Sequence, residues 1–148
     1  MGIRVRRRAE AQWTGPVPTG KGHIRTGSRA LDSDYSLRSR ESDDAPLNTN
    51  PEELIGAGIA GCFAMSVANL LEEGGFADVE VTANAAVLLE QTDAGFRITE
   101  ISLSVTGSAA ALADDDFARI ADRAKRTCPV SLALAGTTVT LESTKVVG

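Results

Sequence analysis

The stretch of sequence that decides the fold is residues 50–63, which read NPEELIGAGIAGCF. Asn50 is a residue type that favours the N-cap of a helix, and Pro51 suits the first helical position. Glu53 follows three residues after the cap, as in a capping box. No charged residue then occurs between Leu54 and Leu71. This pattern predicts one long apolar helix that begins at Pro51.

The predicted helix ends at Gly74-Gly75, and its uncharged part approaches the ~20 residues that a transmembrane helix needs. Glycines, Ser66 and Asn69 interrupt the apolar run, however, and charged residues bracket it closely. A helix that is apolar on all sides can equally be buried inside a protein. We therefore expect a soluble protein with no membrane partner.

The remaining segments predict strands and two further helices. Extended or alternating patterns occupy residues 3–13, 22–27, 35–40, 79–89, 96–106 and 138–146. An amphipathic helix is expected at residues 114–125 with Phe117, Ile120, Ala121 and Ala124 directed inward, and a short helix opens at Cys128-Pro129. This order predicts an α+β fold with antiparallel sheet. With no linker or repeat, a single domain over residues 1–148 is expected.

Composition excludes several classes of function. The net charge of -5 argues against a nucleic-acid-binding protein, and the arginines at positions 4, 6, 7 and 8 are typical of a solvated strand edge. Two cysteines are too few for a disulfide scaffold, and no signal segment follows those arginines, so a cytoplasmic location is expected. His23 is the one histidine, which makes a zinc site unfavourable, and no metal is predicted.

The two thiols, Cys62 and Cys128, are the candidate reactive groups. Cysteine reacts as the thiolate, so each position depends on what lowers its pKa. Cys128 precedes Pro129 at a predicted helix N-terminus, where free amide groups favour negative charge. Cys62 lies about three turns into its helix and needs a cation from another part of the fold. The two residues are either a redox pair or buried thiols that only fill the core.

Glu52 is a further candidate, because Glu53 serves the capping motif and Glu52 does not. It is either a functional acid or a charge that stabilises the first helical turn. Helical geometry separates Glu52 from Cys62 by about 15 Å along the axis and roughly 80° around it. Two chains that pack antiparallel along a strip of small residues would bring these groups together, which predicts a two-fold dimer with composite sites. The strip comprises Ala57, Gly61, Ala64 and Ala68.

The segment from Thr49 to Ala57, the pair Cys62-Phe63 and the downstream motif CPVS at residues 128–131 resemble the OsmC/Ohr family of thiol peroxidases. The resemblance extends to WTG at 13–15, GKG at 20–22 and DAGF at 93–96, and it is closest to the OsmC branch. It implies antiparallel sheets wrapped around a long central buried helix, in an intertwined two-fold homodimer.

The resemblance also implies a role for each matching residue. Cys62 would attack the peroxide and become a sulfenic acid, and Cys128 would resolve it to a disulfide. Arg40 would stabilise the thiolate, and Glu52 would orient that arginine; whether Arg38 contributes is open. The implied activity is reduction of organic hydroperoxides, and of hydrogen peroxide less well, in oxidative or osmotic stress. A dithiol such as a lipoyl-bearing protein would recycle the enzyme, and no bound organic cofactor is implied.

One alternative stays open on the sequence. A non-catalytic dimer that binds small apolar ligands would keep the same scaffold and have inert cysteines. Ile59 also stands where the family often has histidine or an aromatic residue, so the polarity of the pocket is an open question.

Overall fold

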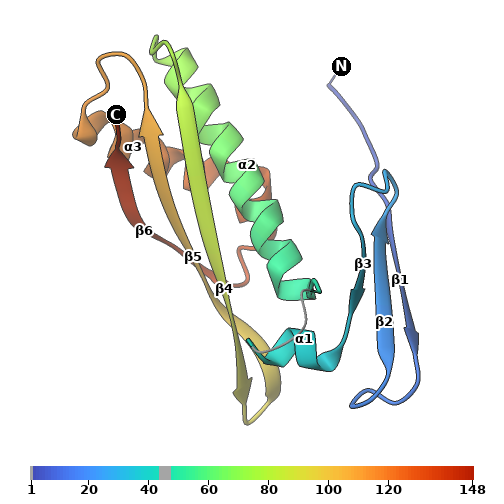
Figure 1. The fold of residues 1–148 in the computed structure, drawn as a ribbon. Coiled ribbons are helices and arrows are strands. Elements are labelled where there is room, and N and C mark those ends of the chain that lie inside the picture. Colours follow the sequence, from blue (N-terminus) through green and yellow to red (C-terminus); the bar gives the residue numbers. More distant parts are fainter. Residues whose placement is uncertain (1, 44–47) are drawn as a thin grey trace. The chain divides into compact units, whose positions relative to one another are not determined.

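The computed structural model describes residues 2–43 and 48–148, and the chain divides into two compact units, Met1–Pro51 and Glu52–Gly148. Figure 1 shows the three strands of the first unit and the long helix and sheet of the second. Each unit is described by itself. The expectation of a single domain remains a prediction.

The first unit is an antiparallel three-stranded sheet in the order β1-β2-β3. Its strands are β1 (Ala9–Thr14), β2 (Lys21–Thr26) and β3 (Asp32–Tyr35). The predicted first strand therefore begins later than expected, because residues 3–8 form no strand. On the apolar face the rings of Trp13 and Tyr35 lie 5.5 Å apart.

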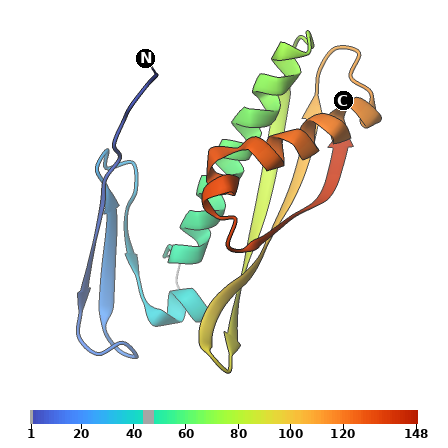
Figure 2. The same cartoon turned by 180° about the vertical axis from the view of Figure 1, so that it is seen from behind.

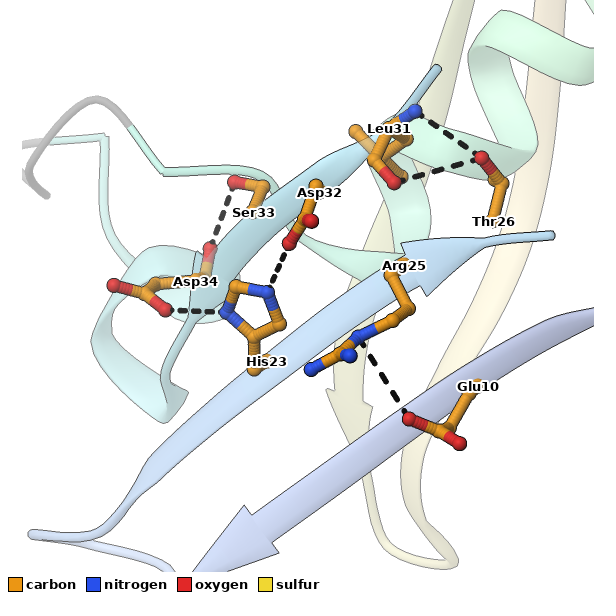
Figure 3. A network of polar contacts seen from close by, with 8 residues as sticks. All are labelled: Glu10, His23, Arg25, Thr26, Leu31, Asp32, Ser33 and Asp34. Atoms are coloured by element: carbon orange, nitrogen blue, oxygen red, sulfur yellow. Dashed lines mark hydrogen bonds and ion pairs between the residues drawn. The ribbon is translucent and has the colours of Figure 1, made fainter. Parts of the chain in front are cut away.

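The other face of this sheet carries a network of charged side chains, which Figure 3 shows in close view. His23 Nδ1 lies 2.7 Å from Asp34 Oδ1, and His23 Nε2 contacts Asp32 Oδ1. Arg25 and Glu10, from neighbouring strands, form a looser ion pair with 3.7 Å between Nε and Oε1. The histidine therefore joins β2 to β3 through two carboxylates.

The segment predicted to be extended over residues 35–40 is mostly helical, so that prediction was wrong. Helix α1 (Leu37–Glu41) begins with a capping box in which Ser36 and Ser39 each hydrogen-bond the backbone of the other. Ser39 Oγ also donates to the carbonyl of Thr49, and Asn50 Nδ2 donates to the carbonyl of Ser39. These contacts are distant in sequence and stabilise the helix, which local alternation could not reveal.

The second unit contains a sheet in the order β4-β5-β6. Strands β4 (Glu80–Thr92) and β5 (Gly95–Ser108) form the predicted antiparallel hairpin, and β6 (Thr138–Val146) pairs with β5 in parallel. The expected purely antiparallel sheet is thus corrected at β6. The reason is the helical crossover between β5 and β6, which carries the chain back along β5 so that β6 runs in the same direction as β5.

Three helices complete this unit: α2 (Pro51–Glu73), α3 (Asp114–Thr127) and α4 (Pro129–Ala133). Figure 2 shows α3 crossing α2 on the side of the sheet that faces the viewer. The core combines Phe63 and Val67 of α2, Leu103 of β5 and Phe117 of α3, all 0% exposed. Since the buried residues of β5 are every second one, both helices cover one face of the sheet.

Helix α2 is long and apolar enough to cross a membrane by length and composition. Ile59, Phe63, Val67 and Leu71 recur at a spacing of four and are fully buried in the core of the unit. This side of the helix therefore belongs to the core of the unit. Its other side is exposed in the single chain: Met65 is 76% exposed, and a Cβ built on Gly58 or Gly61 meets no described atom within 4 Å beyond its chain neighbours and the nearby helix backbone.

Candidate functional site

Helix α2 positions Cys62 between two core residues. Ile59 lies one turn before it and Phe63 directly after it, and both are fully buried. Cys62 is at the edge of this buried stripe and is half-buried. The packing of α2 on the sheet therefore fixes the direction of the thiol while part of its surface stays accessible.

Cys128 is held at the junction of α3 and α4. Its amide donates to the carbonyl of Ala124 at 2.8 Å, and its carbonyl accepts from the amide of Leu132 at 3.0 Å. Cys128 is both the C-cap of α3 and the N-cap of α4. Pro129 occupies the first position of α4, as the sequence predicts. The residue is 0% exposed, so solvent and large reagents do not reach its thiol.

The two sulfur atoms meet although 66 positions separate them in the sequence. Cys128 Sγ lies 2.7 Å from Cys62 Sγ, and both residues are free thiols. A disulfide between them requires little further movement, because the atoms that would bond are already neighbours. This contact is the central feature of the site.

The pKa values of the two thiols shift in opposite directions. Burial raises the pKa of Cys62, and the hydrogen bond with Cys128 raises it further; the Val130 amide and the Ser66 hydroxyl offset this only in part. Burial also raises the pKa of Cys128, but the hydrogen bond with Cys62 and the amide and hydroxyl of Ser131 outweigh it and lower that pKa overall. Within this unit Cys128 is therefore the thiol that loses its proton first as the pH rises.

The other two predicted site residues lie elsewhere in the chain. Glu52 is in the first turn of α2 and is 6% exposed, about 15 Å along the helix axis from Cys62. Arg40 is on α1 in the first unit and is exposed. Because that segment is helical, Arg38 and Arg40 point about 200° apart around the axis instead of sharing a strand face. The structure brings together the two cysteines, and the roles of Arg40 and Glu52 remain predictions.

Sequence reasoning missed two hydroxyl groups beside the thiols. Ser66 follows Cys62 by one helical turn and lowers its pKa, and Ser131 does the same for Cys128. The spacing of four residues on a helix already predicts that Ser66 is a neighbour of Cys62, but it does not indicate a role for the hydroxyl. Among the described residues, no group of three or more His, Cys, Asp or Glu side chains is arranged to hold a metal ion.

Comparisons with known proteins give a consistent result. The family model described as OsmC-like protein matches residues 42–142. Peroxiredoxin OsmC of Escherichia coli is 37% identical over 133 residues, covering 89% of this chain and 92% of that protein. Organic hydroperoxide resistance protein OhrA of Bacillus subtilis is 30% identical over 128 residues, covering 82% and 86%.

Solved structures support the fold. The chain superposes on an organic hydroperoxide resistance protein OsmC from Legionella pneumophila with a TM-score of 0.68 at 24% identity, covering 95% of this chain and 97% of that one. The predicted α+β class and the resemblance stated from the cysteine motifs are both confirmed. On its sequence match and its fold, this chain belongs to the OsmC family.

Proposed function

We propose that this protein is a thiol peroxidase that reduces organic hydroperoxides in stress defence, with Cys62 as the attacking thiolate and Cys128 as the resolving thiol. The observation that carries the proposal is the 2.7 Å contact between the two sulfur atoms. Family membership supports it, because the relatives are named peroxiredoxin and organic hydroperoxide resistance protein. The partly exposed Cys62 can meet a peroxide, whereas the buried Cys128 cannot.

The reaction proceeds in three steps. The Cys62 thiolate attacks the terminal peroxide oxygen, the O–O bond breaks, and the alcohol leaves with one proton while Cys62 becomes a sulfenic acid. Cys128 then attacks the Cys62 sulfur, and a disulfide forms as water leaves. A dithiol finally reduces this disulfide by thiol exchange and is itself oxidised. Such a cycle requires thiols that stay reduced at rest, which favours the cytoplasm.

The raised pKa of Cys62 explains why the site needs a cation. Burial raises this pKa, and contact with Cys128 raises it further, so the second unit by itself holds Cys62 as a thiol near neutral pH. A fixed guanidinium near the sulfur would lower the pKa of Cys62 and favour the thiolate over the thiol, since a positive charge stabilises the thiolate. We assign this role to Arg40, oriented by Glu52 through a bidentate pair.

The distance between Glu52 and Cys62 favours a site shared by two chains. The two residues are about 15 Å apart along one rigid helix, too far to act on the same small molecule. The exposed side of α2 carries the small-residue strip, where Gly61 leaves room for a second helix to approach closely. A two-fold dimer packed along this strip would bring Glu52 of one chain toward Cys62 of the other.

The central test uses the reduced protein and one equivalent of cumene hydroperoxide. We expect rapid loss of both thiols and a Cys62–Cys128 disulfide that is seen by mass spectrometry. Cys62→Ser abolishes turnover, whereas Cys128→Ser permits one oxidation and stalls at the sulfenic or over-oxidised form. Thiols that persist for hours would instead favour the non-catalytic binder of apolar ligands. Loss of the first oxidation in Cys128→Ser alone would reverse the two roles.

A complementation experiment tests the composite site. Cys62→Ser and Glu52→Gln chains are each inactive alone and are unfolded and refolded together. If the site combines residues from two chains, each heterodimer recovers one intact site, and a random mixture regains about a quarter of the wild-type activity. If Glu52 and Cys62 act within one chain, the mixture stays inactive. Sedimentation of each sample supplies the dimer fraction as the control.

A further inference from the structure

Ser131 is a buried hydroxyl that the reaction described above does not use. It occupies the third position of α4 and is 7% exposed. Its Oγ atom is shielded from solvent and makes no hydrogen bond of ordinary geometry to the described residues. A buried polar atom in this state destabilises the fold, so its presence calls for an explanation. Its surroundings supply that explanation.

The Ser131 hydroxyl acts on the sulfur of Cys128, because it is one of the groups that lower the pKa of that thiol. Cys128 is the N-cap of α4 and Ser131 is the third residue after it. A side chain at this position can reach back to the N-cap residue, as in a capping box, although the cap of α4 has no side-chain hydrogen bond. Burial raises the pKa of Cys128, but the hydrogen bond with Cys62 and the amide and hydroxyl of Ser131 have the larger effect and lower it. Because a hydroxyl hydrogen rotates freely, Ser131 can turn toward the sulfur once that sulfur is charged.

We propose that Ser131 is a positioning residue for the resolving thiol: its hydroxyl donates to the Cys128 sulfur whenever that sulfur carries negative charge. This inference deepens the proposed function and rests on it for its catalytic meaning. It gives Ser131 a part in two steps, the formation of the disulfide and its reduction.

In the first step the Cys128 thiolate attacks the sulfenic sulfur of Cys62. The S–S bond forms, the S–O bond breaks, and the departing hydroxide takes a proton to become water. Ser131 increases the fraction of Cys128 that is thiolate. At a pH below the pKa of Cys128, lowering that pKa by one unit raises the thiolate fraction about tenfold. The thiolate also becomes a weaker nucleophile, but this loss cancels only about threefold of the gain.

In the second step Cys128 is the leaving group. Since Cys128 is 0% exposed and Cys62 is partly exposed, an external dithiol reaches the Cys62 sulfur. Its thiolate bonds to that sulfur, the Cys62–Cys128 bond breaks, and Cys128 leaves with the electron pair. The second thiol of the reductant then closes on the mixed disulfide and releases Cys62. A thiol of lower pKa leaves faster, so Ser131 accelerates this step.

The first experiment measures the pKa of Cys128 in a Cys62→Ser background by thiolate absorbance. Replacing Ser131 with threonine retains the hydroxyl, and replacing it with valine removes the hydroxyl at the volume of threonine. We expect the valine variant to titrate about one pKa unit above the threonine variant, as one hydrogen bond to a charged group predicts. Ser104→Ala is the matched control, because Ser104 alternates with the buried residues of β5 and faces away from the helices. Equal pKa values in the threonine and valine variants, or an equal rise in Ser104→Ala, would overturn the proposal.

The second experiment isolates the reductive step in chains that keep both cysteines. The disulfide is formed with diamide, so no peroxide activity is needed, and its reduction by dithiothreitol is followed by thiol release. We expect Ser131→Val to be reduced several-fold more slowly than Ser131→Thr. Equal rates for the two variants would refute the role of Ser131. If the rates differ as expected but the wild-type protein consumes no peroxide, only the proposed function would be refuted.

Discussion

Gly107 of β5 lies so close to Phe117 of α3 that adding one methyl group should disrupt the core. A Cβ built on Gly107 falls 2.7 Å from both Cε1 and Cζ of the Phe117 ring, and 3.3 Å from the carbonyl oxygen of Glu80. Carbon atoms in ordinary contact lie about 3.5–4.0 Å apart, so the ring must retreat by about 1 Å. Phe117 is 0% exposed and has core atoms around it, which leaves little space for that movement.

We therefore expect Gly107→Ala to lower the free energy of unfolding by about 1–3 kcal/mol, the usual cost of overpacking a core. With an m-value of about 2 kcal/mol/M, the midpoint of urea unfolding falls by about 0.5–1.5 M. Gly58→Ala is the control for the same change of residue. It lies inside α2, where a Cβ meets no described atom within 4 Å beyond its chain neighbours and the nearby helix backbone, so the change should stabilise the protein by about 0.5–1 kcal/mol. All variants are compared at one protein concentration, since association adds to stability.

A double-mutant cycle with Phe117→Leu tests the cause. The smaller side chain makes room for the methyl group that Gly107→Ala adds, so the double variant should be more stable than the sum of the two single losses by at least about 0.5 kcal/mol. A Gly107→Ala protein as stable as wild type, or strictly additive losses, would show that the contact with Phe117 is not what excludes a side chain at this position.

Two further predictions concern the charged network and the core. Hydrogen bonds to Asp34 and then Asp32 raise the pKa of His23 from 6.5, with a smaller opposing effect of burial. The contribution of this network to the stability of the fold is complete below pH 6.5 and is lost as the pH rises through the raised pKa of His23. NMR titration should therefore place the pKa of His23 above 6.5, and Asp34→Asn should return it toward that value. A measured pKa at or below 6.5 would exclude the network. Phe63→Ala should cost about 3–5 kcal/mol in urea unfolding because Phe63 is 0% exposed, whereas Phe96→Ala, at a side chain 51% exposed, should cost about 1 kcal/mol or less; similar losses would contradict this placement.

Several elements could be predicted because their signals are local. The N-cap, proline and glycine signals bound α2 within one residue of its observed ends, and alternation located β4, β5 and β6. Helix α1 could not be predicted in this way. Its Ser39 is secured by the carbonyl of Thr49 and by Asn50, which lie ten or more residues away. The parallel pairing of β6 was missed, although a strand, a helical crossover and another strand are typical of a parallel pair.

The amino-acid sequence by itself determined the family, the long apolar helix and the identity of the two thiols, because short motifs and helical periodicity are properties of neighbouring residues. Only the tertiary structure decided that these thiols touch, that Cys128 is the more acidic of the pair, and that the Ser131 hydroxyl is buried beside it. These facts depend on the packing of α3 against α2 and the sheet. Packing joins positions 66 residues apart, and no local pattern contains the direction in which two such helices cross.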